Sequence, residues 1–120
     1  MIEIDSLFES VDRGGVMYQN IEVEKVKEMI GKKRATIIDV RLKEDYNREK
    51  IEGALNIFFG DYDFDEQVDE FPKDNKYIIY CQIGVGSLKA IGIMEDLGFK
   101  DLYNMSGGLK KWKEMGYEVK

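Results

Sequence analysis

Continuous apolar runs alternate along the chain with stretches in which apolar residues recur every three or four positions. Residues 35–40 (Ala-Thr-Ile-Ile-Asp-Val) and 76–80 (Lys-Tyr-Ile-Ile-Tyr) hold the two clearest runs, rich in β-branched and aromatic side chains. Such runs are typical of strands that are buried on both faces. Weaker runs predict three more strands, at residues 18–21, 54–57 and 101–103.

Helical patterns lie between these strands. In residues 22–30 the side chains of Val23, Val26 and Ile30 fall on one stripe. Residues 87–97 carry the best helical stripe, with Ser87 expected to cap its N-terminus. We expect further helices at residues 43–47, 65–71 and 109–115, and a short N-terminal helix within residues 4–13.

Alternating strands and helices predict an α/β fold, a three-layer sandwich around a mainly parallel five-stranded sheet. The length of 120 residues is that of one ordinary domain. We expect residues 1–17 to form an N-terminal extension and residues 18–120 to form the domain.

Composition excludes several kinds of chemistry. The chain has no histidine, which removes Ser-His-Asp and Cys-His nucleophile arrangements and His-ligated zinc. Its single cysteine, Cys81, cannot form an intrachain disulfide or a paired redox motif. The net charge of −6 disfavours nucleic acid as a partner. Without a long apolar run or a basic leader, the chain is expected to avoid membranes and to be cytoplasmic.

Two suggestive motifs fail in detail. Residues 61–65 (Asp-Tyr-Asp-Phe-Asp) begin like a calcium-binding loop, but Glu66 stands at the required glycine and Pro72 at the required glutamate. The segment Gly84-Val85-Gly86-Ser87 lacks the lysine of a phosphate-binding loop. We therefore expect neither a metal nor another cofactor, and the oligomeric state is left open.

Cys81 is the strongest candidate for chemistry, because it directly follows the apolar run 76–80. Ligand sites in open α/β sheets lie beyond the carboxyl ends of strands. Gly84 and Gly86 allow backbone N–H groups to turn inward, and the following helix adds its own free N–H groups. Such a setting lowers the pKa of a thiol from its usual value of about 8.5. The alternative is that Cys81 is only a small buried core residue.

Five segments in order resemble the single-domain rhodaneses, a family of sulfurtransferases, across residues 18–119. They are 37–41 (Ile-Ile-Asp-Val-Arg), 51–57 (Ile-Glu-Gly-Ala-Leu-Asn-Ile), 80–87 (Tyr-Cys-Gln-Ile-Gly-Val-Gly-Ser), 97–99 (Leu-Gly-Phe) and 107–112 (Gly-Gly-Leu-Lys-Lys-Trp). The resemblance implies that Cys81 takes a sulfur from a donor, holds it as a persulfide and passes it to an external thiol or other nucleophile. The loop that would bind the persulfide is Gln82, Ile83, Gly84, Val85, Gly86 and Ser87.

This loop departs from the family pattern. Rhodanese loops often carry arginine at the positions of Gln82 and Gly86, so thiosulfate capture is expected to be weaker and a small-molecule or protein persulfide is an equally good donor. Lys89 is the nearest positive charge in sequence. Asp39 and Arg41 are expected to pair and to tie the strand end to the loops. The aromatic residues of loop 58–64 are expected to wall the site.

Two other functions stay open at this point. The chain could be a non-catalytic rhodanese-like regulatory or interaction module, which the arginine-free loop favours. A cysteine-dependent phosphatase would need a longer loop and an arginine six residues after Cys81, where Ser87 stands. Thiol reactivity separates the enzyme from the module, because an unactivated cysteine keeps a pKa of about 8.5 or higher.

Overall fold

The computed structural model describes residues 10–12 and 17–120, and in these residues the strands form one sheet. The strands are β1 (Ser10–Asp12), β2 (Met17–Ile21), β3 (Thr36–Asp39), β4 (Leu55–Asn56), β5 (Tyr77–Tyr80) and β6 (Leu102–Met105). Their order is β1-β2-β6-β5-β3-β4, and only the β1–β2 pair is antiparallel. The five predicted strands are therefore confirmed as the parallel part of the sheet.

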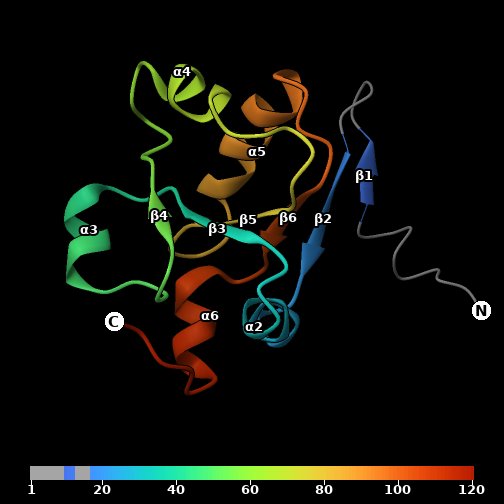
Figure 1. Cartoon of the computed structure of the whole chain (residues 1–120). Helices are drawn as coiled ribbons and strands as arrows, with labels where there is room; N and C mark the ends of the chain where they lie inside the picture. Colours follow the sequence, from blue (N-terminus) through green and yellow to red (C-terminus); the bar gives the residue numbers. More distant parts are fainter. Residues whose placement is uncertain (1–9, 13–16) are drawn as a thin grey trace, which may run out of the picture.

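The helices cover both faces of this sheet. They are α2 (Val23–Gly31), α3 (Lys43–Arg48), α4 (Phe64–Asp69), α5 (Gly86–Asp96) and α6 (Gly108–Glu114), each within two residues of its predicted bounds. Figure 1 shows α4 and α5 on one side of the sheet and α2 and α6 on the other. The predicted three-layer sandwich is confirmed.

The central strand β5 shows why the sandwich has two cores. Its side chains alternate between the faces because successive residues of a strand point in opposite directions. Tyr77 and Ile79 belong to the apolar cluster that includes α4 and α5 residues. Ile78 and Tyr80 belong to the cluster that includes α2 and α6 residues. Both faces are thus buried, which explains the continuous apolar run.

Strand β1 corrects the prediction of a helix over residues 4–13. Residues 10–12 are extended and pair with β2, with Val11 opposite Tyr18. The backbone of β2 presents an edge on that side, and pairing with it favours a strand whatever the local pattern. The rest of the predicted helix falls outside the described residues. The division into an extension of residues 1–17 and a domain of residues 18–120 stays a prediction.

The parallel arrangement brings the carboxyl ends of the central strands to one edge of the sheet. Asp39 at the end of β3 lies in register with Tyr80 at the end of β5. On the other side of β5, Ile79 is in register with Asn104 of β6. The residues that follow these strand ends, Val40 and Cys81, therefore lie close together at the edge where ligand sites form in such sheets.

Candidate active site

Cys81 follows the last residue of β5, and its side chain is only 6% exposed. Although it is counted among the buried core residues, its sulfur does not have purely apolar surroundings. The amide N–H groups of Gly84 and Ser87 donate to Sγ over 3.1 and 3.3 Å. The Ser87 hydroxyl oxygen is 3.5 Å from Sγ. Polar groups thus converge on the thiol from the loop that follows it.

These groups change the acidity of the thiol. Burial, the largest single effect, raises the pKa of Cys81, because a thiolate is less well solvated there. Hydrogen bonds from the Ser87 side chain and from the amides of Ser87, Gly84 and Ile83 act in the opposite direction. Together they outweigh the burial, so the pKa of Cys81 lies below its ordinary value. The loop favours the thiolate, which is the nucleophilic form.

Gly84 lets the loop turn back onto the sulfur. Its φ of 93° lies in the left-handed region that residues with a side chain rarely adopt. A Cβ at this position would lie 3.0 Å from the amide nitrogen of Gly107. Both the backbone conformation and the close packing therefore require glycine where the Gly84 amide reaches Sγ.

Ser87 has a different role from the predicted helix cap. The helix α5 begins one residue earlier, at Gly86, and its N-cap residue Val85 makes no side-chain capping bond. Ser87 is fully buried, and its hydroxyl donates to Asn104 Oδ1 at 2.5 Å. The Asn104 amide in turn donates to Asn20 Oδ1 at 2.8 Å. The sequence analysis missed Asn104 and Asn20, although a polar residue inside the apolar strand β6 was the available signal.

The helix α6 holds the loop from the other side. The amides of Leu109 and Lys110 donate to the carbonyl oxygens of Cys81 and Gln82, over 2.9 and 3.0 Å. Gly108 makes this approach feasible, since a Cβ there would lie 2.5 Å from the Gln82 carbonyl. The Gly-Gly pair at 107–108 is thus part of the support of the Cys81 loop.

Asp39 and Arg41 form the predicted charged pair. Both are buried, and the Arg41 guanidinium donates to Asp39 Oδ2 at 2.7 Å and to the Glu49 carbonyl at 2.7 Å. Burial lowers the pKa of Arg41, but the hydrogen bonds and charge of Asp39 reverse this effect and raise it overall. A longer contact of 3.4 Å links Arg41 to the Gln82 side chain. The pair therefore ties the end of β3 to the loop that carries Cys81.

Of the aromatic residues expected to wall the site, Phe59 lies beside it. A Cβ at Gly86 would be 3.1 Å from the Phe59 ring and 3.8 Å from Cys81 Sγ. Phe64, the first residue of α4, is buried in the core, and Tyr62 is 98% exposed. Lys89 is exposed on the first turn of α5.

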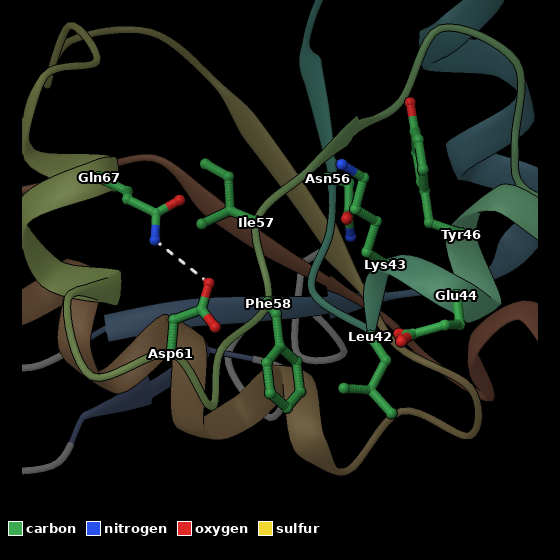
Figure 2. Close-up of a pocket in the computed structure, with 9 residues that line it drawn as sticks. All are labelled: Leu42, Lys43, Glu44, Tyr46, Asn56, Ile57, Phe58, Asp61 and Gln67. Carbon is green, nitrogen blue, oxygen red and sulfur yellow. Dashed lines mark hydrogen bonds between the residues drawn. The ribbon is translucent and has the colours of Figure 1, made fainter.

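Phe58 faces a separate cavity of about 570 Å³. Figure 2 shows that the residues around this cavity come from the start of α3 and from the segment 56–67, with a hydrogen bond of 3.2 Å between Gln67 and Asp61. Cys81 does not line it. The rings of Phe58 and Phe59 meet edge to face with their centroids 5.4 Å apart, and Phe58 is the one of the two that lines this cavity.

Within residues 10–12 and 17–120, no group of three or more metal-ligating side chains comes together. None of the helices in the same part of the chain has the length and apolar character needed to cross a bilayer. Residues 61–63, which begin like a calcium loop, form an acidic turn that leads into α4.

The sequence matches the Rhodanese-like domain family over residues 22–115. It is 29% identical over 99 residues to the thiosulfate sulfurtransferase GlpE of Coxiella burnetii strain RSA 331, a match that covers 82% of this chain and 90% of that protein. It is 33% identical over 82 residues to the uncharacterized protein YqhL of Bacillus subtilis, covering 68% and 64% of the two chains.

Solved structures show the same relationship. A rhodanese-related protein from Thermoplasma volcanium is 27% identical, with a TM-score of 0.70 over 86% of this chain and 98% of that one. A rhodanese-like domain protein from Staphylococcus aureus is 29% identical, with a TM-score of 0.72 over 84% of this chain and 97% of that one. The fold and the sequence thus identify the same family.

Proposed function

The chain belongs to the rhodanese-like domain family, and on this premise we propose that it is a sulfurtransferase that carries a sulfane sulfur on Cys81. The observation that carries the proposal is the convergence of two backbone amides and the Ser87 side chain on Sγ. Preorganised donors of this kind stabilise a sulfur anion at every stage of the reaction. The similarity to thiosulfate sulfurtransferases supports the same class of chemistry.

The reaction has two steps. The Cys81 thiolate attacks the outer sulfur of a donor, forms a new S–S bond, and the donor's remaining fragment leaves with the electron pair of the broken bond. An external thiolate then attacks the outer sulfur of the persulfide and regenerates the Cys81 thiolate. Because Cys81 is the only cysteine in the chain, the acceptor comes from outside. The donor is thiosulfate or a persulfide on a small molecule or a protein.

Further amides are available for the added sulfur. Among the described residues, the N–H groups of Val85 and Gly86 meet no backbone or side-chain acceptor within hydrogen-bond distance. Both residues stand at the start of α5, where the helix dipole favours negative charge. These groups support a role for the loop in holding the outer sulfur of a persulfide as well as Sγ.

A free thiol that must remain reduced suits the cytoplasm, our expected location.

Intact-protein mass spectrometry tests this function directly. After incubation with thiosulfate, polysulfide or glutathione persulfide, the wild-type chain should gain the mass of one sulfur atom, and a reductant should remove it. Cys81→Ser should gain none, and Ser10→Ala, a change on the edge strand β1 that leaves Cys81 intact, should load like wild type. If no donor loads the wild-type chain, the enzyme is refuted in favour of the non-catalytic module.

A further inference from the structure

In the part of the chain that the structure describes, residues 10–12 and 17–120, no hydrogen bond or ion pair joins a positive side chain to Cys81 Sγ. Arg41, the nearest buried cation, is held by Asp39 and by the Glu49 carbonyl. Lys89 is on the exposed side of the first turn of α5. The loop itself, residues 82–87, contains no charged residue, and the chain carries a net charge of −6. Electrostatic attraction for a doubly charged donor is therefore weak here.

An aromatic ring occupies the space that a side chain at the end of the loop would fill. A Cβ at Gly86 would meet two Phe59 ring carbons at 3.1 and 3.3 Å, which is tighter than ordinary contact. The same point is 3.8 Å from Cys81 Sγ. Phe59 is partly buried against the core cluster that contains Cys81, so its ring is backed by packed side chains. The sulfur thus has an apolar wall beside it.

The outer rim of the loop is also apolar. Ile83 is 57% exposed and Val85 is 60% exposed, in a loop whose amides turn inward to the sulfur. Exposed large aliphatic side chains beside a reactive thiol favour contact with uncharged organic groups over contact with a hydrated oxyanion. The rim and the Phe59 wall therefore both favour a donor with an uncharged organic group over a hydrated oxyanion.

We propose that Phe59, together with Ile83 and Val85, makes an organic persulfide R–S–SH the preferred sulfur donor over thiosulfate. This inference rests on the proposed sulfurtransferase function and names its substrate class. The organic group R lies on the apolar rim, and the narrow S–SH end reaches Sγ past the Phe59 ring. The tetrahedral sulfonate end of thiosulfate is larger, fully hydrated and doubly charged, so it fits this wall poorly.

The two donors also differ in the charge that they bring. With the persulfide, Cys81–S⁻ and R–S–SH give Cys81–S–SH and R–S⁻, so the total charge is −1 throughout. With thiosulfate, Cys81–S⁻ and S–SO₃²⁻ give Cys81–S–S⁻ and SO₃²⁻, and the total charge is −3. In both cases one S–S bond breaks, one forms, and the leaving group takes the electron pair. A loop without a free cation suits the first reaction.

The test compares the loading rates of two donors by intact-protein mass spectrometry. The donors are thiosulfate and the persulfide of N-acetylcysteine amide, which carries no charge on its organic group. Wild type should load the persulfide about tenfold faster or more, the discrimination expected of a shaped apolar site. Phe59→Ala removes the wall and should lower the ratio of the persulfide rate to the thiosulfate rate by about fivefold, mainly because thiosulfate loads faster.

Two further variants serve as controls. Tyr62→Ala removes an aromatic ring from the same loop, but that residue is 98% exposed, so the variant should leave the ratio within about twofold. Phe59→Leu keeps an apolar side chain in the wall and should fold even if Phe59→Ala does not. It should also lower the ratio of the persulfide rate to the thiosulfate rate, but by less than Phe59→Ala does.

The outcomes are distinguishable. Equal or faster loading of wild type by thiosulfate overturns the inference and leaves the sulfurtransferase proposal intact. An unchanged ratio in both Phe59 variants, or an equal drop in Tyr62→Ala, overturns the role of Phe59. Failure of both donors to load wild type overturns the proposed function and, with it, this inference.

Discussion

The hydrogen bonds of Ser87 lead to a quantitative prediction for the reactivity of Cys81. The Ser87 hydroxyl has one proton and two neighbours, Cys81 Sγ at 3.5 Å and Asn104 Oδ1 at 2.5 Å. While Cys81 is a thiol, its S–H donates to the Ser87 oxygen and the hydroxyl proton is directed to Asn104. When Cys81 ionises, that proton turns to the thiolate. Ser87→Ala removes this donor and should raise the pKa of Cys81.

The magnitude follows from the exchange of one hydrogen bond for another. A hydrogen bond to a charged group contributes about 1.5–3 kcal/mol, and a neutral one about 0.5–1.5 kcal/mol. Ser87 loses the neutral bond to Asn104 when it bonds to the thiolate, so its net preference for the thiolate is about 1–1.5 kcal/mol. Since about 1.4 kcal/mol is a factor of ten, the thiolate population below the pKa should fall about five- to tenfold.

Iodoacetamide alkylation measured as a function of pH provides the assay, because only the thiolate reacts at an appreciable rate. The variant should lose about five- to tenfold in rate at neutral pH and recover toward the wild-type rate at high pH. Ser10→Ala, a serine to alanine change on the edge strand β1, three strands away from β5 in the sheet, should leave the profile unchanged. If Ser87→Ala alkylates as fast as wild type at neutral pH, the Ser87 hydroxyl does not stabilise the thiolate and the reasoning is wrong.

Two further predictions concern the support of the site. Arg41→Ala leaves the buried Asp39 carboxylate without its partner and should lower the free energy of unfolding by about 3–5 kcal/mol in urea denaturation. Its control, Arg48→Ala, breaks an exposed pair with Asp45 and should cost less than about 1 kcal/mol. Equal costs in the two variants would contradict the importance of the buried pair. Gly108→Ala places a Cβ 2.5 Å from the Gln82 carbonyl and should slow Cys81 alkylation as well as destabilise the fold. Gly116→Ala has a similar positive φ but open space around it, so it should cost only the left-handed backbone energy of about 1–2 kcal/mol and leave alkylation unchanged.

The local pattern of the sequence was enough to predict the parallel sheet and its helices. The run 76–80 has no polar alternation, which requires cover on both faces, and β5 is indeed buried on both. Glycine positions marked the turns, since Gly31 ends α2 and Gly98 follows the end of α5. The same reasoning placed Cys81 at a strand end before a glycine-containing loop. All these features depend on neighbours in sequence or on the period of a single element.

Contacts between distant segments decided the rest. No local signal showed that residues 10–12 would pair with β2, because an edge strand forms where another strand leaves backbone groups unpaired. The expected cap at Ser87 was wrong because α5 already begins at Gly86, so Ser87 lies inside the helix, where its hydroxyl donates to Asn104, 17 positions later. Phe59 comes beside Gly86 only through the packing of its loop against α5.

The sequence by itself therefore determined the five parallel strands, the helices between them and Cys81 as the single cysteine. The tertiary structure alone decided what surrounds that sulfur: amides from its own loop, the support of α6, the Asn104 network and the Phe59 wall. The physical reason is the distance along the chain over which each effect acts. Hydrophobic periodicity and backbone propensity act over a few residues, whereas the environment of a buried thiol is made by side chains and amides that only folding brings within a few ångströms.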